Sequence, residues 1–515
     1  MKRISVRLLA DESTARRLAP ALDARRFELT PDATARVVVA ATSRPITARD
    51  ASALKDLVKG GGGLVVVGGT LAAWSRSAAI RELAGWAPSG PSPVTELVLR
   101  STDAPEWRLR DALYLSEGPP AGATVSIRTS WRYTEQVVAY ERRFGDGRFV
   151  YLGLGTEPAT YVDARFQQLV ARLVMLAAGR ETPAALGVGL LGYGAIGRDH
   201  AASIGATSGL RLAAVCDLSA ERREAASRDW QVRTYAGQQE LLEDQGVGLV
   251  VVGTPPSAHS EAVLAALRAG KHVVCEKPFA LRAAEADRMI DEARSRGLVL
   301  TVYQSRRWDP DYVALRDVLR SGSIGAPFYM ESFIGGYEHP CDFWHSHEPI
   351  SGGTIYDWGS HYFDWILQLF EARVLSVSAH AHNRVWHDVT NADQVSVALT
   401  FDGGAQAMFL QSAIASVRKP KWYVLATEGA VVGDWADVPV PADLPAVVKV
   451  HRSSGVETLH LPPRDDQGFY GNLAAQFAWD EPLAVRAEDA RRNVAVMEAA
   501  TESIRRGGAQ MAVDI

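Results

Sequence analysis

The chain has 515 residues, which is too long for a single hydrophobic core and predicts two or three domains. With 47% hydrophobic and 22% charged residues it has a globular composition, and a formal net charge of -5 excludes the basic balance of a nucleic-acid-binding protein. No apolar run reaches the ~20 residues of a membrane-spanning helix, so we expect no membrane partner. Three cysteines predict no disulfide framework and a reducing, cytoplasmic location.

Residues 1–180 show alternating strand and helix patterns, which predict a layered α/β domain. This third of the chain lacks histidine and cysteine, because the first of each are His200 and Cys216. We therefore expect the chemistry to lie after residue 185. The predicted elements are a buried strand at 35–42, a helix at 47–60 with Thr47 as its N-cap, a strand at 60–69, a hairpin at 136–155 and a helix at 164–180.

The glycine-rich turn into "LVVVGG" (64–69) and "GDGRFVYLGLG" (145–155), followed by a closing helix, resembles a known fold. The fold that these motifs resemble is the ThuA-like (trehalose-utilisation) branch of the class I glutamine-amidotransferase-like, flavodoxin-like fold. Amidotransferases of this fold use a Cys–His pair, and ThuA-like proteins usually place a histidine where this chain has Thr156. Because both of these residue types are missing from residues 1–180, we expect this ThuA-like domain to be non-catalytic.

A dinucleotide-binding pattern follows a predicted linker at 179–185. A strand from Leu186 leads into "GYGAIG" (192–197) and a helix, and the next strand ends at Asp217, twenty residues after Gly197. Gly192 allows the tight turn, Gly194 lets a pyrophosphate approach the backbone, and Gly197 lets helix and strand pack closely. The Asp217 carboxylate favours NAD over NADP, while Arg222 and Arg223 keep NADP open.

Two further segments carry candidate functional side chains. "KHVVCEKPF" (271–279) predicts a strand that ends at Lys277, where a lysine is either at the ligand crevice or simply solvated. In "SGGTIYDWGSHYFDWILQLF" (351–370) the polar residues Asp357, His361, Asp364 and Gln368 fall in one stripe of a predicted apolar helix. The stripe fits a metal site, an acid–base site or a wet helix face, and its apolar surroundings favour a cavity.

"GYGAIG", "TPPSAHSEAV" (254–263), "CEKPF" (275–279) and "SGGTIYDWGSHYFD" (351–364) together resemble the Gfo/Idh/MocA family, and "VYQSRRWDPDY" (302–312) resembles its scyllo-inositol-type dehydrogenases. The resemblance covers residues 186–515. It implies a Rossmann NAD-binding domain at 186–305 and a C-terminal α/β domain at 306–515 with a large, mostly antiparallel sheet. That sheet commonly forms subunit contacts in the family, so we expect a homo-dimer or homo-tetramer.

The expected reaction is hydride transfer between a ring hydroxyl of a sugar, glycoside or cyclitol and the nicotinamide. His361 suits the role of base by its intrinsic pKa, and Asp357 lies one helical turn earlier, where it could orient the imidazole or the substrate. The resemblance places Lys277, preceding a cis Lys277–Pro278 bond, beside the reacting hydroxyl. The catalytic set is thus Lys277, Asp357 and His361, and we expect no metal.

The motifs also imply the remaining binding residues. The expected cofactor site consists of Gly192, Tyr193, Gly194, Ala195, Ile196, Gly197, Asp217, Thr254, Pro255, His259, Glu276, Lys277 and Gln304. The expected substrate site consists of Lys277, Arg307, Trp308, Tyr337, His345, Asp357, His361 and Asp364.

Three alternatives remain at this point. A cluster of His339, Cys341, His345, His347 and His361 would suit a metalloenzyme, but its spacing matches no common zinc motif. A redox-assisted, NAD-dependent glycosidase or lyase would use the same lysine and histidine. A non-enzymatic NAD-binding sugar sensor would need neither.

Overall fold

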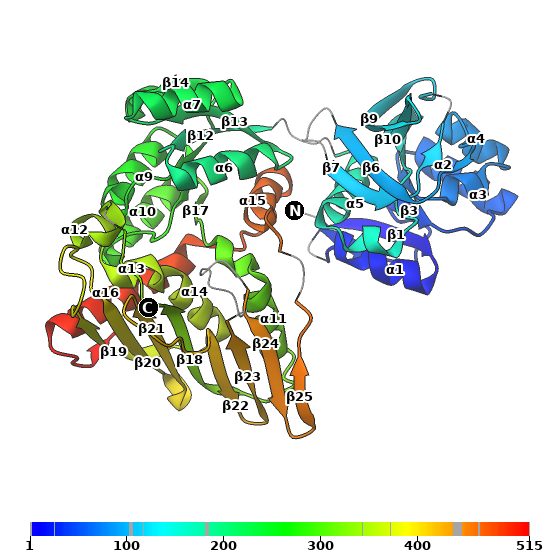
Figure 1. Cartoon of the computed structure of the whole chain (residues 1–515). Helices are drawn as coiled ribbons and strands as arrows, with labels where there is room; N and C mark the ends of the chain where they lie inside the picture. The colour runs from blue at the N-terminus through cyan, green and yellow to red at the C-terminus, as the bar shows by residue number, and fades with distance from the viewer. Residues whose placement is uncertain are drawn as a thin grey trace. The chain divides into compact units, whose positions relative to one another are not determined.

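The structure is a computed structural model that describes residues 3–24, 26–101, 107–116, 118–180, 185–341, 343–370, 372–435, 445–461, 464–513 and 515. Residues 181–184 of the predicted linker lie outside these ranges. The chain divides into two compact units (Figure 1). One contains Met1–Ala185 with Gly205–Gly209 and Leu473–Pro482, and the other contains the remainder. Each unit is described by itself.

The first unit is built on a nine-stranded sheet in the order β2-β1-β3-β4-β11-β10-β9-β6-β7. The first five strands are parallel in the flavodoxin-like order, and the other four extend the sheet antiparallel. The strands are β1 Ile4–Ala10, β2 Phe27–Leu29, β3 Val37–Ala41, β4 Gly63–Val67, β6 Thr95–Ser101, β7 Trp107–Asp111, β9 Ala123–Trp131, β10 Thr134–Phe144 and β11 Gly147–Leu152. A separate pair consists of β5 Gly90–Pro91 and β8 Tyr114–Leu115.

Helices cover both faces of this sheet, which is why β3 and β4 are continuous apolar runs. α1 and α5 contribute to one core cluster, while α2, α3 and α4 contribute to the other. The helices are α1 Glu12–Leu18, α2 Ala48–Lys59, α3 Thr70–Trp74, α4 Ala78–Ala84 and α5 Ala164–Ala177. Thr47 caps α2 as predicted, because its Oγ1 accepts a hydrogen bond from the Asp50 backbone N–H at 3.1 Å.

The second unit begins with a six-stranded, fully parallel sheet in the order β14-β13-β12-β15-β16-β17, the arrangement of a Rossmann fold. Its strands are β12 Leu186–Leu191, β13 Leu210–Cys216, β14 Arg233–Tyr235, β15 Leu249–Val252, β16 His272–Cys275 and β17 Leu300–Val302. Its helices are α6 Ala195–Gly205, α7 Ala220–Trp230, α8 Gln238–Glu243, α9 His259–Arg268 and α10 Ala283–Ser295.

A second nine-stranded sheet follows, in the order β25-β24-β23-β22-β18-β21-β20-β19-β26. Only β18 and β21 pair in parallel among these strands, and the predicted large, mostly antiparallel sheet is confirmed. The strands are β18 Pro327–Gly335, β19 Val374–His382, β20 Gln394–Phe401, β21 Gln406–Ser412, β22 Trp422–Ala426, β23 Gly429–Asp434, β24 Val447–Arg452, β25 Gly455–Thr458 and β26 Met511–Ala512.

Helices α11, α14 and α16 pack against this sheet, on β24, β21 and β19 respectively (Figure 1). The helices of this region are α11 Pro310–Arg320, α12 Glu348–Ser351, α13 Thr354–Asp357, α14 Gly359–Leu369, α15 Gly468–Trp479 and α16 Ala487–Arg505. α16 also packs on α10 of the Rossmann domain, where the Ala283 N–H donates to Glu498 at 2.9 Å. Among the described residues, no helix combines the length and apolarity needed to cross a membrane.

The predicted continuous helix in 351–370 is instead divided at Trp358, between α13 and α14. The Asp357 carbonyl explains the break, because it accepts a hydrogen bond from the Ser360 hydroxyl at 2.7 Å and contacts Lys277 Nζ at 3.4 Å. Side chains thus replace the backbone donor that would continue the helix. Asp357 therefore ends one helix, and His361 lies in the first turn of the next.

Candidate active site

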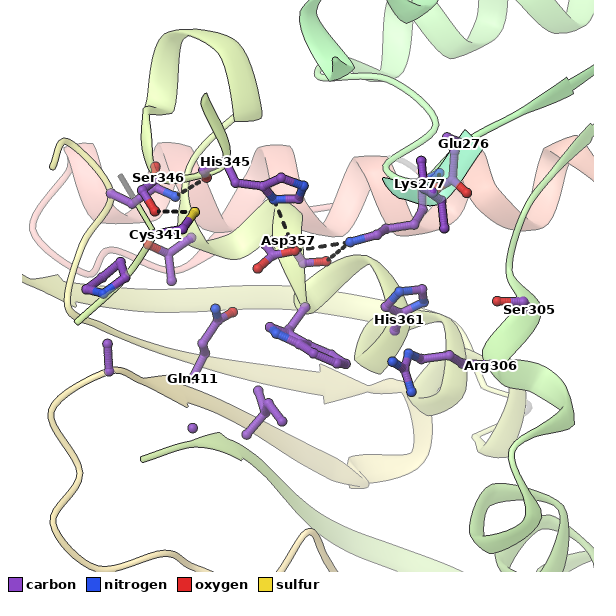
Figure 2. A pocket seen from close by; sticks show the side chains of 18 of the residues that line it. Glu276, Lys277, Ser305, Arg306, Cys341, His345, Ser346, Asp357, His361 and Gln411 are labelled. Atoms are coloured by element: carbon purple, nitrogen blue, oxygen red, sulfur yellow. Dashed lines mark hydrogen bonds and ion pairs between the residues drawn. The ribbon is translucent and has the colours of Figure 1, made fainter. Parts of the chain in front are cut away.

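A cavity of about 1000 Å³ lies between the carboxyl ends of the Rossmann strands and the helical face of the second sheet. Lys277 reaches it from the loop after β16, while Asp357 and His361 reach it from α13 and α14 (Figure 2). These three predicted residues therefore meet in one pocket, although eighty residues separate the first two along the chain.

The turn after β12 has the steric features of a dinucleotide site. Gly192 has a φ of +100°, and a Cβ there would meet the Gly253 carbonyl oxygen at 2.7 Å. A Cβ at Gly197 would meet the Gly192 carbonyl oxygen at 2.4 Å, so helix and strand could not pack as they do. A Cβ at Gly194 would have only Arg222 at 3.8 Å, which leaves that backbone open to a ligand. The residues present thus fit a bound pyrophosphate.

Asp217 directly follows β13, where an acidic residue can bond to the ribose of a dinucleotide. Its Oδ2 accepts a hydrogen bond from the Tyr193 N–H at 2.7 Å and lies 3.6 Å from Arg222 Nη1. Arg223 instead donates to the Asp217 backbone oxygen at 2.7 Å. Thr254 is another residue predicted to bind the cofactor. Its Oγ1 is buried and has no hydrogen-bond partner among the described residues, as expected of a group that bonds to a ligand.

Buried side chains hold the loops on the cofactor side of the pocket. Glu276 accepts from the Lys277 N–H at 2.8 Å and contacts His200 Nε2 at 2.9 Å. His259, predicted to touch the cofactor, is fully buried and lies 2.8 Å from both the Thr254 and Pro278 carbonyl oxygens. It therefore ties the loop after β15 to the loop after β16. The Lys277–Pro278 bond is cis, as predicted.

Lys277 and Asp357 form an ion pair, with Nζ 3.1 Å from Oδ1 (Figure 2). His345 Nδ1 lies 3.9 Å from the same Asp357 oxygen. Burial lowers the pKa of His345, with a further contribution from the Lys277 charge, while Asp357 opposes both effects. The carboxylate therefore lies between an ammonium and an imidazole at the pocket wall.

His361 is held by Gln304 rather than by Asp357. The Gln304 Nε2 donates to the Ser360 carbonyl at 3.0 Å, which leaves its Oε1 facing His361 Nδ1 at 3.2 Å. Because an amide oxygen only accepts, Nδ1 must carry the proton, and Nε2 keeps its lone pair. Burial lowers the pKa of His361 well below its usual value, and the Lys277 and Arg306 charges lower it further. These effects favour the neutral form of the imidazole.

Two predicted substrate residues, Asp364 and Arg307, pair with each other instead of lining the pocket. Arg307 Nε and Nη2 lie 2.7 and 2.6 Å from the two Asp364 oxygens, a bidentate arrangement, and both side chains are buried. Asn493 also donates to Asp364, at 3.2 Å. Tyr337 is 57% exposed and is not among the lining residues, whereas Trp308 and His345 are.

Two further polar residues line the pocket: Arg306, which the sequence placed at the pocket wall beside Arg307 and Trp308, and Gln411, which the sequence did not predict. Arg306 lies over the Trp358 ring, 4.8 Å from its centroid, and is one of the charges that lower the pKa of His361. Gln411 follows Phe409 on the helical face of β21 (Figure 2), and its Oε1 is buried with no partner among the described residues. In the sequence, Gln411 follows Ala407 and Phe409 at alternate positions of β21. A polar residue on this otherwise apolar face could have predicted a site there.

The histidine and cysteine cluster of the metal alternative is dispersed. His339 contacts Asp388 at 2.9 Å, and Cys341 contacts the Ser346 hydroxyl at 3.2 Å (Figure 2). The described part of the chain contains no group of three or more histidine, cysteine or acidic side chains placed to bind one metal ion.

Comparisons with known proteins identify both domains of the second unit. Residues 186–304 match the profile described as "Oxidoreductase family, NAD-binding Rossmann fold", and residues 312–432 match the "GFO/IDH/MocA C-terminal domain". An uncharacterised oxidoreductase of Schizosaccharomyces pombe is 40% identical over 141 residues, which is 27% of this chain and 38% of that protein. The chain thus aligns with little more than a third of this curated relative.

Longer alignments exist at lower identity. The scyllo-inositol 2-dehydrogenase (NADP+) of Bacillus subtilis is 27% identical, over 64% of this chain and 97% of that protein. The crystal structure of an NAD-binding protein from Listeria innocua has a TM-score of 0.57 and 28% identity, over 64% of this chain and 97% of that chain. Residues 186–304 thus match the NAD-binding Rossmann domain, and residues 312–432 the C-terminal domain, of the Gfo/Idh/MocA family.

Proposed function

We propose that the protein is an NAD(P)-dependent dehydrogenase that oxidises a ring hydroxyl of a cyclitol or sugar. One observation carries this proposal: a neutral histidine, His361, shares a pocket with the Lys277–Asp357 ion pair at the mouth of a dinucleotide-binding turn. Alcohol oxidation needs a proton acceptor beside a group that stabilises the developing alkoxide, and this pocket supplies both.

A bound nicotinamide would accept the hydride that leaves the substrate carbon. His361 Nε2 takes the hydroxyl proton, while the O–H electron pair forms the new C=O bond and the C–H pair departs as hydride. Lys277 donates a hydrogen bond to the oxygen and stabilises its negative charge. Asp357 holds the ammonium in place, so it acts through Lys277 and not through His361.

The substrate class follows from the pocket walls and from the relatives. Asp357, His345 and Gln411 offer several hydrogen-bonding groups to adjacent hydroxyls, and Trp308 offers an aromatic face. The similarity to an inositol dehydrogenase supports a cyclitol first and a sugar second. The volume of about 1000 Å³ also leaves space for a substituent, such as the aglycone of a glycoside.

We infer NAD as the preferred cofactor, because the Asp217 carboxylate would accept from a ribose 2′-OH and repel a 2′-phosphate. The nearby Arg222 and the NADP+ dependence of the Bacillus subtilis relative support the alternative.

An NAD(P)+ reduction screen over myo-inositol, scyllo-inositol, glucose and simple glucosides tests the proposal. We expect net reduced cofactor with at least one substrate, and losses of about 100-fold or more in His361→Asn and Lys277→Met. Aglycone release without net reduced cofactor would instead support the glycosidase alternative. Tight cofactor binding without turnover of any substrate in a wider screen would favour the sensor.

For residues 1–180 we propose a non-catalytic ThuA-like module. Asp111 supports this: it is buried and accepts from the Gly155 N–H at 2.7 Å, from the Glu157 N–H at 3.0 Å and from Thr160 Oγ1 at 3.0 Å. Thr156, at the position where a histidine is expected, also bonds to Asp111. The loop after β11 is thus closed around a structural carboxylate. An intact catalytic rate in Asp111→Asn, with a lower melting temperature, would agree with this role.

We also propose that the chain forms a homo-oligomer through the face of the second sheet that points away from α11, α14 and α16. Across this face Met408, Leu410, Leu425 and Val432 are only partly buried, and Tyr423 is 37% exposed. Such an apolar surface is typical of a subunit contact. Light scattering on wild type and on Leu410→Glu tests it, and a monomeric wild type would contradict it.

A further inference from the structure

A second pocket, of about 670 Å³, lies in the same unit and shares no lining residue with the candidate active site. It is formed by the last residue of α11, the end of α14, the entry to β19 and the first turns of α16. Four arginines line it, Arg320, Arg373, Arg486 and Arg492, together with Asp489 and Gln368. We call it the arginine pocket.

The charges of the arginine pocket are unbalanced. Among the described residues, the guanidinium groups of Arg320, Arg373 and Arg492 form no hydrogen bond or ion pair. Ile515 also lines the pocket, but it forms no ion pair with any of these three arginines. The fourth, Arg486, lies 2.7 Å from Asp489. Among the described side chains that line the pocket, four guanidinium groups thus face one carboxylate, and their mutual repulsion favours an anion between them.

The first turn of α16 adds to this field. Arg486 is the residue before the helix, and no side chain caps the helix there. The N-terminus of a 19-residue helix carries partial positive charge and free backbone N–H groups, and the first two turns supply Asp489 and Arg492 to the pocket wall. The helix and the arginines therefore attract the same kind of ligand.

We propose that the arginine pocket binds a small phosphorylated metabolite. Guanidinium groups match phosphate oxygens in pairs of parallel hydrogen bonds, and three unpaired ones can engage more than one oxygen at once. The volume exceeds that of a phosphate group and leaves space for an organic part, beside the partly buried Gln368 amide and Leu367. This assigns a ligand-facing role to Gln368, the last residue of the polar stripe that contains Asp357 and His361.

A short chain of ion pairs joins the arginine pocket to α14, the helix that carries His361. Asp489 contacts Arg486 in the pocket and Arg307 at 3.5 Å, and Arg307 holds Asp364 in its bidentate pair. Asp364 lies one turn after His361 on α14. A phosphate that draws Arg486 away from Asp489 would strengthen the hold of Asp489 on Arg307.

Titration of inorganic pyrophosphate into the full-length protein, saturated with NAD+ so that the glycine turn is occupied, tests the proposal. We expect one pyrophosphate per chain, and binding weakened by about tenfold or more in Arg373→Gln/Arg492→Gln, since each charged hydrogen bond is worth about that factor. Arg505→Gln/Arg506→Gln is the matched control, because it also removes two positive charges, at the other end of α16.

Three results would overturn the proposal: no binding, unchanged binding in the double variant, or an equal loss in the control. Melting temperatures check that the variants fold. Arg492→Lys is a milder variant that should bind pyrophosphate at an intermediate level, because lysine keeps the charge but cannot form two parallel hydrogen bonds. Repeating the titration with glucose 6-phosphate and with ADP then separates sugar phosphates from nucleotides. None of these readouts depends on the proposed dehydrogenase reaction.

Discussion

The Oε1 atom of Gln304 lies 3.2 Å from Nδ1 of His361, and in the proposed reaction this contact leaves Nε2 as the nitrogen that accepts the proton. Replacing Gln304 with leucine removes both the acceptor for Nδ1 and the donor to the Ser360 carbonyl. We expect kcat to fall by about 100-fold with little change in KM, because the ring loses its orientation. Steady-state kinetics measures the two constants. Gln304→Glu keeps an acceptor and should retain more activity than Gln304→Leu, and the reverse order would contradict this role.

The pH profile of alcohol oxidation should reflect the lowered pKa of His361. The base works only when neutral, so activity is present above this pKa and lost as the pH falls through it. Because burial, Lys277 and Arg306 all lower the pKa from 6.5, we expect the acidic limb of kcat/KM to lie below pH 6.5. Arg306→Met removes one of these charges and should move the limb to higher pH. Arg418→Met, in the same pocket, is the control and should leave it in place.

Asp364 should prove to be a structural residue. Its substitution by asparagine leaves the buried Arg307 without its bidentate partner, and we expect unfolding to become easier by about 3–5 kcal/mol. Thermal and urea denaturation measure this loss. A fully stable Asp364→Asn with a raised KM would instead return Asp364 to the substrate site predicted from the sequence. The double variant Asp364→Asn/Arg307→Met should recover part of the lost stability.

Gln411 should contribute to substrate binding without contributing to stability. Gln411→Leu replaces a buried, unpartnered amide by an apolar group of similar size, so the melting temperature should stay the same or rise. KM for the polyol should rise by about three- to tenfold with kcat retained, the size expected for one neutral hydrogen bond. A lower melting temperature together with an unchanged KM would show that Gln411 only fills space.

Asp217 and Arg222 should control the choice of cofactor in opposite directions. Asp217→Asn keeps an acceptor for the Tyr193 N–H but removes the charge that repels a 2′-phosphate, so KM for NADP+ should fall relative to KM for NAD+. Arg222→Ala should raise KM for NADP+ by about tenfold and leave NAD+ unaffected. Equal effects on both cofactors would place Arg222 outside the site of the 2′-phosphate.

Local sequence patterns predicted the elements and motifs well, since glycine spacing, apolar runs and caps depend on near neighbours. The turn at Gly192–Gly197, the helix after Thr47 and the hairpin β10–β11 all have such local causes. The Asp364–Arg307 pair does not, because the two residues lie 57 positions apart and a polar stripe alone cannot reveal a buried partner. The Gln304–His361 contact and the arginine pocket likewise depend on elements that meet only in the folded chain.

The position of α16 has a consequence for the order in which the protein can be made. This helix, Ala487–Arg505, packs on both α10 and β19, and the backbone near Ala283 is bonded to its Glu498. A ribosome that has already released the Rossmann strands must still synthesise the second sheet and then this helix. The Rossmann domain therefore stays incompletely packed until residues 487–505 are made. Premature termination before residue 487 should yield a product that exposes the apolar surface that α16 would have covered, and such surfaces are recognised by quality-control proteases.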